Sequence, residues 1–114
     1  MESEIKPWGS YEVLYEDESC KIKKLIVSPK QSLSLQYHLR RQEHWTVVEG
    51  VAEVLIDNRV YHLFEQNSAF VPYHSNHQLV NASEDDRLVV IEVQTGEYFG
   101  EDDIVRVQDP HNRE

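Results

Sequence analysis

The chain has 114 residues, with 21 acidic side chains against 11 basic ones and a formal net charge of −10. A chain of this length forms one domain with a hydrophobic core, so we expect a single domain over residues 1–114. The acidic balance argues against nucleic acid or an anionic membrane as a partner. With one cysteine, no leader-like start and no long apolar run, we expect no internal disulfide and a cytoplasmic location.

The basic residues are distributed unevenly along the chain. From Lys21 to Arg41 there are six bases and no acid, whereas the rest of the chain holds all 21 acids and five bases. A locally positive stretch in an acidic protein suits a small anionic ligand. A solvated strand face explains the same pattern, so both interpretations stay open.

Alternation of Val, Ile, Leu and Tyr with polar residues indicates β-strands throughout the chain. In chain order, the predicted strands cover residues 11–15, 20–28, 33–38, 43–49, 52–57, 59–64, 68–72, 77–81 and 87–95. Asp57 and Asn58 suit a tight hairpin, because both residue types tolerate a positive φ. The acidic run Glu101–Asp103 predicts the start of a short terminal helix, because carboxylates favour a helix N-terminus.

Nine short strands with turns between them are typical of an all-β sandwich or closed barrel, which can enclose a ligand cavity. Alternation places Gln36 and His38 on one face of their strand, and Glu92 and Gln94 on one face of theirs. Together with Glu43, these residues would bring polar groups from different strands into one cavity. Such groups are costly in a dry core unless they are paired or bind a metal.

Four of the polar side chains, Gln36, His38, Glu43 and His77, form a set of oxygen and nitrogen donors that suits one divalent metal ion. Imidazole favours zinc, iron or nickel, and carboxylate or amide oxygen extends the choice toward manganese. We therefore predict a mononuclear site for zinc, manganese, iron, cobalt or nickel. The alternative is that the Gln-x-His pair is structural.

The spacing of these donors is similar to two motifs of the cupin superfamily, the second of which runs from Pro72 through His77 to Asn81. Cupins are small double-stranded β-helix, or jelly-roll, barrels that hold a metal. The resemblance implies an all-β cupin barrel. Lys30 and His74 stand where the family motifs have glycine.

Five runs carry a closer resemblance: Lys6 to Glu12, Leu33 to Gln36, Glu43 to Trp45, Ile91 to Gln94, and Gly100 to Arg106. They resemble the type II mannose-6-phosphate isomerase domain over about residues 6–109. In many bacteria that domain is the C-terminal part of a bifunctional mannose-1-phosphate guanylyltransferase. The resemblance covers the isomerase-type domain alone.

The resemblance implies metal-dependent interconversion of mannose 6-phosphate and fructose 6-phosphate. This chemistry needs a general base and a group that stabilises an oxyanion. We expect His44 or Glu92 to be the base, although alternation turns His44 away from Glu43. The sugar phosphate needs cationic donors, for which the candidates are Lys23, Arg40, Arg41 and Arg106.

Other functions stay open at this point. Leu39 and Arg40 replace two histidines of the isomerase family, which favours a non-catalytic cupin that binds a sugar phosphate or a nucleotide sugar. A metal-dependent oxygenase on the same barrel is a third interpretation. Because cupins commonly pair through edge strands, the resemblance also implies a homodimer.

Overall fold

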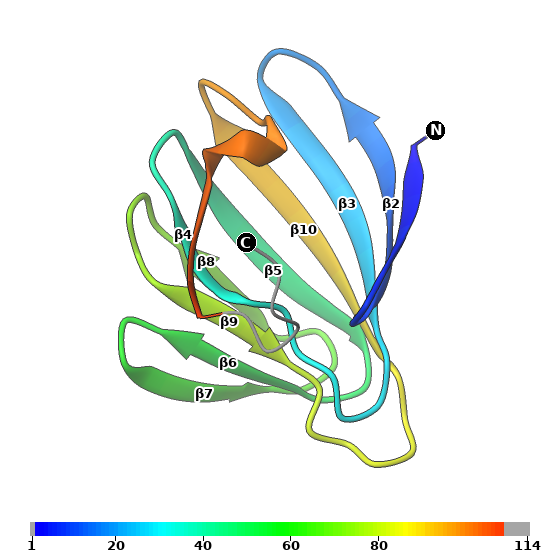
Figure 1. The fold of residues 1–114 in the computed structure, drawn as a ribbon. Helices are drawn as coiled ribbons and strands as arrows, with labels where there is room; N and C mark the ends of the chain where they lie inside the picture. The colour runs from blue at the N-terminus through cyan, green and yellow to red at the C-terminus, as the bar shows by residue number, and fades with distance from the viewer. Residues whose placement is uncertain (1, 109–114) are drawn as a thin grey trace.

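The chain folds into two antiparallel sheets that face each other as a jelly roll (Figure 1). The computed structural model describes residues 2–108. In spatial order, the six-stranded sheet contains β1 (Ser3–Lys6), β2 (Gly9–Glu16), β3 (Cys20–Val27), β10 (Leu88–Gly96), β5 (Arg41–Glu49) and β8 (Ser68–Val71). The five-stranded sheet contains β11 (Ile104–Gln108), β4 (Leu35–His38), β9 (His77–Val80), β6 (Ala52–Ile56) and β7 (Arg59–Leu63). The predicted all-β barrel is confirmed.

The predicted strands correspond in order to β2 through β10, and two outer strands were missed. β1 is short and carries two charged residues, while β11 is exposed along most of its length. Strand β1 lacks the apolar alternation that marks a half-buried strand, whereas residues 105–108 of β11 do alternate and were not used. Strand β5 also begins at Arg41 rather than at Glu43, which places Arg41 inside the barrel.

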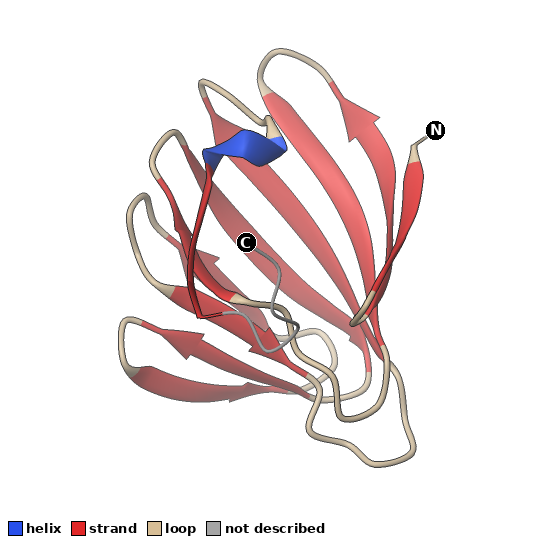
Figure 2. Ribbon diagram, viewed as in Figure 1, coloured by secondary structure: helices blue, strands red, loops and turns tan. Residues whose placement is uncertain are grey.

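The predicted terminal helix is a single 3₁₀ turn, η1 (Glu101–Asp103), followed directly by β11. Figure 2 shows this turn as the one helical segment drawn within residues 2–108. No helix in that range is long and apolar enough to cross a membrane. The acidic residues therefore begin a single helical turn. The helix does not continue, because Ile104–Gln108 pairs with β4.

The predicted hairpin at Asp57 and Asn58 is confirmed, with φ of 48° and 71° respectively. Two other positive-φ positions are Lys30 at 62° and His74 at 65°, the positions at which the cupin motifs have glycine. The backbone thus keeps the left-handed conformation at both places although the side chain has changed. Glycine adopts this conformation without the steric cost that Lys30 and His74 carry.

The interior of the barrel is divided into a polar end and an apolar end. Along β3 the inward side chains change from Lys21 and Lys23 to Leu25 and Val27, all of which are buried. The inward side chains of β5 and β10 change from polar to apolar at the same levels as those of β3. Gln94 pairs with Glu43 and Lys21, Glu92 with Trp45 and Lys23, and Val90 with Val47 and Leu25. The apolar end forms the hydrophobic core, and the polar end is free to hold a site.

Asn81 stabilises the apolar end through its side chain. It is 1% exposed, donates to the carbonyls of Val27 (3.0 Å) and Asp86 (2.8 Å), and accepts from the Ser83 amide (3.1 Å). These bonds hold the turn between β9 and β10 against the end of β3. The polar residue therefore has a structural role in the second cupin motif.

We expect Asn81→Ala to lower the free energy of unfolding by about 2–4 kcal/mol, because it leaves buried backbone groups without partners. Urea unfolding followed by circular dichroism measures the loss. Asn76→Ala is the control, because the bonds found for Asn76 are made by its backbone. Equal stability of the two variants would contradict this role for Asn81.

Candidate metal centre

Three of the four predicted metal donors converge between the sheets. His38 and His77 come from the five-stranded sheet, Glu43 comes from the six-stranded sheet, and all three are at most 3% exposed. One donor atom from each residue lies within 4.8 Å of the other two. The Nε2 of His38 is 3.3 Å from Glu43 Oε2, and the Nε2 of His77 is 3.8 Å from Glu43 Oε1.

Backbone carbonyls fix the tautomer of both imidazoles. His38 Nδ1 donates to the Asp103 carbonyl at 3.3 Å, and His77 Nδ1 donates to the Ser75 carbonyl at 2.9 Å. A carbonyl can only accept, so each ring carries its proton on Nδ1 and leaves Nε2 as an acceptor atom beside Glu43. This is the arrangement by which outer hydrogen bonds orient histidine ligands of a metal.

The electrostatic environment keeps His38 in the neutral form that binds metals. Burial lowers the pKa of His38 to about 3, and the nearby Arg41 guanidinium and His77 act in the same direction. A metal ion therefore does not have to displace a proton from His38 at neutral pH. The donor chemistry, burial and tautomers fit one divalent ion.

Gln36, the fourth predicted donor, lies beside the other three. It pairs with His77 in the register of β4 and β9 and lines the same cavity. Its Nε2 donates to Ser34 Oγ at 3.2 Å. This bond occupies the amide nitrogen and leaves the amide oxygen as the atom that could bind a cation.

Arg41 occupies a position that the sequence did not predict. This phosphate-binding candidate has a side chain that is 3% exposed and contacts the donor set. Its Nε donates to Glu43 Oε2 at 3.1 Å, and its Nη2 donates to His38 Nε2 at 3.3 Å. The guanidinium therefore balances the buried Glu43 carboxylate.

Glu92 lies deeper in the cavity and holds two neighbouring side chains. Its Oε2 accepts from Trp45 Nε1 at 3.0 Å, and its Oε1 accepts from Gln94 Nε2 at 2.6 Å. Burial raises the pKa of Glu92, and the negative charge of Glu43 raises it further. The Trp45 ring also packs edge-on against His77, with 5.5 Å between ring centroids, so Glu92 is connected to the metal donors through Trp45.

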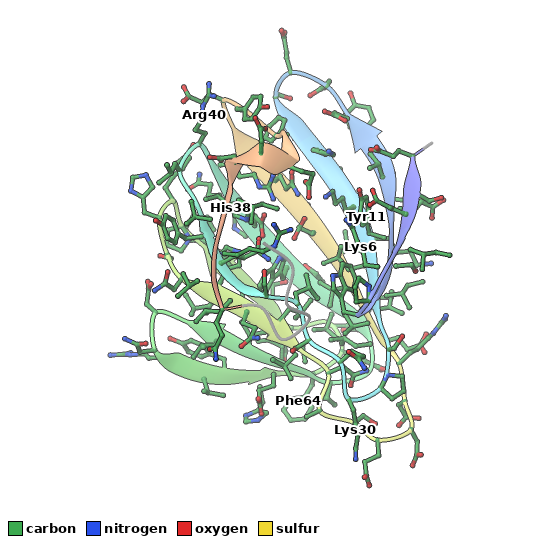
Figure 3. The ribbon with its side chains drawn as sticks, in the orientation of Figure 1. Lys6, Tyr11, Lys30, His38, Arg40 and Phe64 are labelled. Atoms are coloured by element: carbon green, nitrogen blue, oxygen red, sulfur yellow. The ribbon has the colours of Figure 1, made fainter. Side chains whose placement is uncertain are left out.

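The structure separates the remaining predicted site residues into two groups. Lys23, Arg41, Glu92 and Arg106 line the cavity. His44 and Arg40 do not: His44 is exposed and packs on Phe70, and Arg40 is exposed and donates to Glu97 at 3.2 Å. Figure 3 shows Arg40 at the rim of the barrel and His38 inside it.

The cavity also contains residues that the sequence did not single out as functional. Lys6, Tyr11 and Glu101 also line it. Tyr11 donates to Glu4 Oε2 at 2.8 Å, and the Lys23 ammonium lies 4.2 Å from the Tyr11 ring centroid. All three belong to runs that resemble the isomerase domain, so the signal was present but was used only to recognise the family.

Comparison with known proteins identifies the family. A family model described as "Mannose-6-phosphate isomerase C-terminal" matches residues 2–109. The chain belongs to this family. Mannose-1-phosphate guanylyltransferase of Sinorhizobium fredii is 42% identical over 110 residues, which are 96% of this chain and 21% of that protein. The alginate biosynthesis protein AlgA of Pseudomonas putida is 45% identical over 108 residues, which are 95% of this chain and 22% of that protein.

The chain therefore spans about a fifth of the length of these curated relatives. Solved structures support the fold. KdgF from Halomonas sp. superposes with a TM-score of 0.77 at 17% identity, covering 87% of this chain and 86% of KdgF. A cupin-2 domain from Rhodospirillum rubrum gives a TM-score of 0.71 at 18% identity, covering 82% of this chain and 67% of that domain. The cupin fold is confirmed.

We expect His38→Ala and His77→Ala each to weaken binding of a divalent ion at least about 100-fold, since even loss of an outer hydrogen bond costs 10–100-fold. Titration of the metal-free protein with zinc or cobalt, followed by calorimetry, measures the affinity. His44→Ala is the matched control, because His44 lies on the outer face. Unchanged affinity in the His38 and His77 variants would contradict a metal site at these residues.

Glu92→Gln removes the charge of the buried carboxylate and keeps the size of the side chain. Because the folded-state pKa of Glu92 is raised, its contribution to stability is present below the unfolded value of about 4.5 and is lost as pH rises toward the folded value. We expect Glu92→Gln to gain stability relative to the wild type across that window, by about 1.4 kcal/mol for each pH unit. Urea unfolding from pH 4 to pH 8 measures the difference in stability between the two proteins. A difference that stays constant with pH would contradict the raised pKa of Glu92.

The fold should tolerate this substitution. Gln94 Oε1 is the buried side-chain atom that lacks a hydrogen-bond partner within residues 2–108. If the Gln94 amide turns over, this oxygen can accept from the new amide nitrogen at position 92. A rearranged fold in Glu92→Gln would show as a changed near-ultraviolet circular dichroism spectrum.

Proposed function

We propose that this domain is a metal-dependent isomerase that interconverts mannose 6-phosphate and fructose 6-phosphate. The observation that carries the proposal is the buried triad of His38, Glu43 and His77, in which both Nε2 atoms lie within 3.8 Å of the Glu43 carboxylate, in a chain of the mannose-6-phosphate isomerase C-terminal family. Gln36 completes the proposed donor set. Of the metals that suit these donors, zinc, manganese, iron, cobalt and nickel are the candidates.

The bound ion would act as a Lewis acid toward the oxygens on C1 and C2 of the sugar. The remaining work falls to the chain. His38 and His77 are held in fixed orientations by the carbonyls of Asp103 and Ser75, and Trp45 closes the cavity behind His77. These ordered groups would position the sugar at the polar end of the barrel, and such positioning lowers the barrier of a reaction.

Glu92 is our candidate for the proton carrier. In the open-chain aldose it would take the proton from C2 as the C1–C2 double bond of the enediol forms. It would then return that proton to C1, while a proton moves from O2 to O1 and leaves the C2 ketone. A raised pKa makes the carboxylate a stronger base, and each oxygen keeps a second lone-pair direction beside its present bond.

Cations at the cavity are the proposed partners of the phosphate. Lys23 and Arg41 lie inside, while Lys6 and Arg106 line the mouth. Arg40, which was also predicted to bind phosphate, points to the rim and is left out of this proposal. These cations suit the charge of a small anionic sugar. We extend the proposal to a cytoplasmic homodimer that binds a sugar phosphate and binds neither nucleic acid nor a membrane.

A second candidate is a cupin that binds a sugar phosphate or a nucleotide sugar without turnover. The observation that favours it is the Arg41 guanidinium, which contacts both Glu43 and His38. An arginine in this position competes with a cation for the same two donor atoms. It could therefore keep the site free of metal.

An assay of the purified domain with mannose 6-phosphate, after removal of metal and re-addition of each candidate ion, separates the two functions. We expect turnover to return with at least one ion and to fall by about 100-fold or more in His38→Ala and Glu92→Gln, since these residues act on the reacting atoms. His44→Ala should keep its activity. Bound metal without turnover of any hexose phosphate would overturn the isomerase and leave the binding protein.

A further inference from the structure

The cavity is too small in this structure for the proposed substrate. Its water-accessible space is about 60 Å³, whereas pockets that hold small molecules measure roughly 300–1,000 Å³. A hexose phosphate therefore enters only after part of the wall moves. The group that moves must be one whose displacement costs little free energy.

Glu101 on η1 is the cavity-lining side chain that best fits this role. Its Oε2 lies 3.1 Å from Lys23 Nζ and 3.7 Å from Arg41 Nη1. The Lys23 and Arg41 side chains are 5% and 3% exposed, while that of Glu101 is 46% exposed. One half-exposed carboxylate therefore covers two buried cations.

The backbone around Glu101 is anchored, so its side chain can move alone. Both carboxylate oxygens of Asp103 accept from the turn between β4 and β5, at 3.3 Å from the Leu39 amide and 3.0 Å from the Arg40 amide. Before the turn, Phe99 is buried and its carbonyl accepts from Arg41. Rotation of the Glu101 side chain into solvent would expose Lys23 and Arg41 without unfolding η1.

A phosphate group fits the place that the carboxylate would leave. An ammonium and a guanidinium bind carboxylate and phosphate through the same charge-assisted hydrogen bonds. A phosphate monoester brings three oxygens and a larger negative charge than one carboxylate. The two anions therefore compete for the same cations.

We propose that Glu101 is an internal anion that occupies a phosphate subsite formed by Lys23 and Arg41, and that the phosphate of an entering ligand displaces it. This inference rests on the proposed function for the identity of the ligand. It assigns Glu101, which the sequence did not single out, to control of access to the site.

Inorganic phosphate is the probe that tests the subsite without any reaction. We expect Glu101→Gln to bind phosphate about fivefold to tenfold more tightly than the wild type, because the competing charge is gone. Calorimetric titration at low ionic strength measures the affinity. Asp102→Asn is the matched control: it removes the same charge from the same turn, but the Asp102 carboxylate accepts from Tyr98 Oη and does not line the cavity.

A double variant locates the bound phosphate. The gain in phosphate affinity should disappear when Lys23→Met is combined with Glu101→Gln, since Lys23 is the cation closer to Glu101. Equal gains in Asp102→Asn, or a gain that survives the loss of Lys23, would overturn the proposal. A phosphate affinity of Glu101→Gln that is unchanged or weaker would also overturn it. Glu101→Ala provides a second removal of the charge if thermal unfolding shows that the Gln variant is misfolded.

Kinetics separate this proposal from the isomerase itself. In an active enzyme, Glu101→Gln should lower KM for mannose 6-phosphate and keep kcat within about twofold, because Glu101 opposes binding and leaves the reacting atoms untouched. A collapse of kcat with unchanged phosphate affinity would assign Glu101 to proton transfer and overturn the proposal. Tighter phosphate binding without turnover in any variant would support the subsite and defeat the isomerase.

Discussion

The buried Glu43 carboxylate is the group on which the polar end of the barrel depends. It contacts His38 and His77 from the opposite sheet and Arg41 from its own strand. A carboxylate at 1% exposure is unfavourable unless its charge is compensated. Arg41 supplies the charge and the histidines supply contacts across the sheets. The same residue therefore joins the two sheets and organises the donor set.

Period-2 alternation explains how the sequence assembles this site. On β3, β5 and β10 every second side chain points between the sheets, and the inward positions at one end of all three strands are polar. The antiparallel register brings these polar positions to the same level. Because alternation is a local property, the sequence predicted that His38, Glu43 and Glu92 would face a common interior, whereas the register depends on pairing between distant parts of the chain.

Contacts set by turns and edge strands were not predictable in the same way. The predicted strand began at Glu43, yet β5 begins at Arg41, and this carries the Arg41 side chain inside the barrel. Glu101 was seen as part of a helix start, but β11 pairs with β4 and fixes η1 over the cavity. Each miss depends on where a neighbouring segment packs, which no local pattern records. His44 shows the reverse: alternation already indicated its outward direction.

The charges around the cavity bear on how the proposed metal ion and the proposed anionic ligand would affect each other. Lys23 and Arg41 are buried cations, and Glu43 and Glu92 are buried carboxylates of the same cavity. Lys6 and Arg106 also line this cavity, so Glu101 offsets part of an excess of positive charge. A divalent ion at His38 and Glu43 would increase this excess, which favours an anion over an empty subsite. An incoming phosphate can satisfy that excess better than one half-exposed carboxylate, so the ion and the anionic ligand would bind cooperatively.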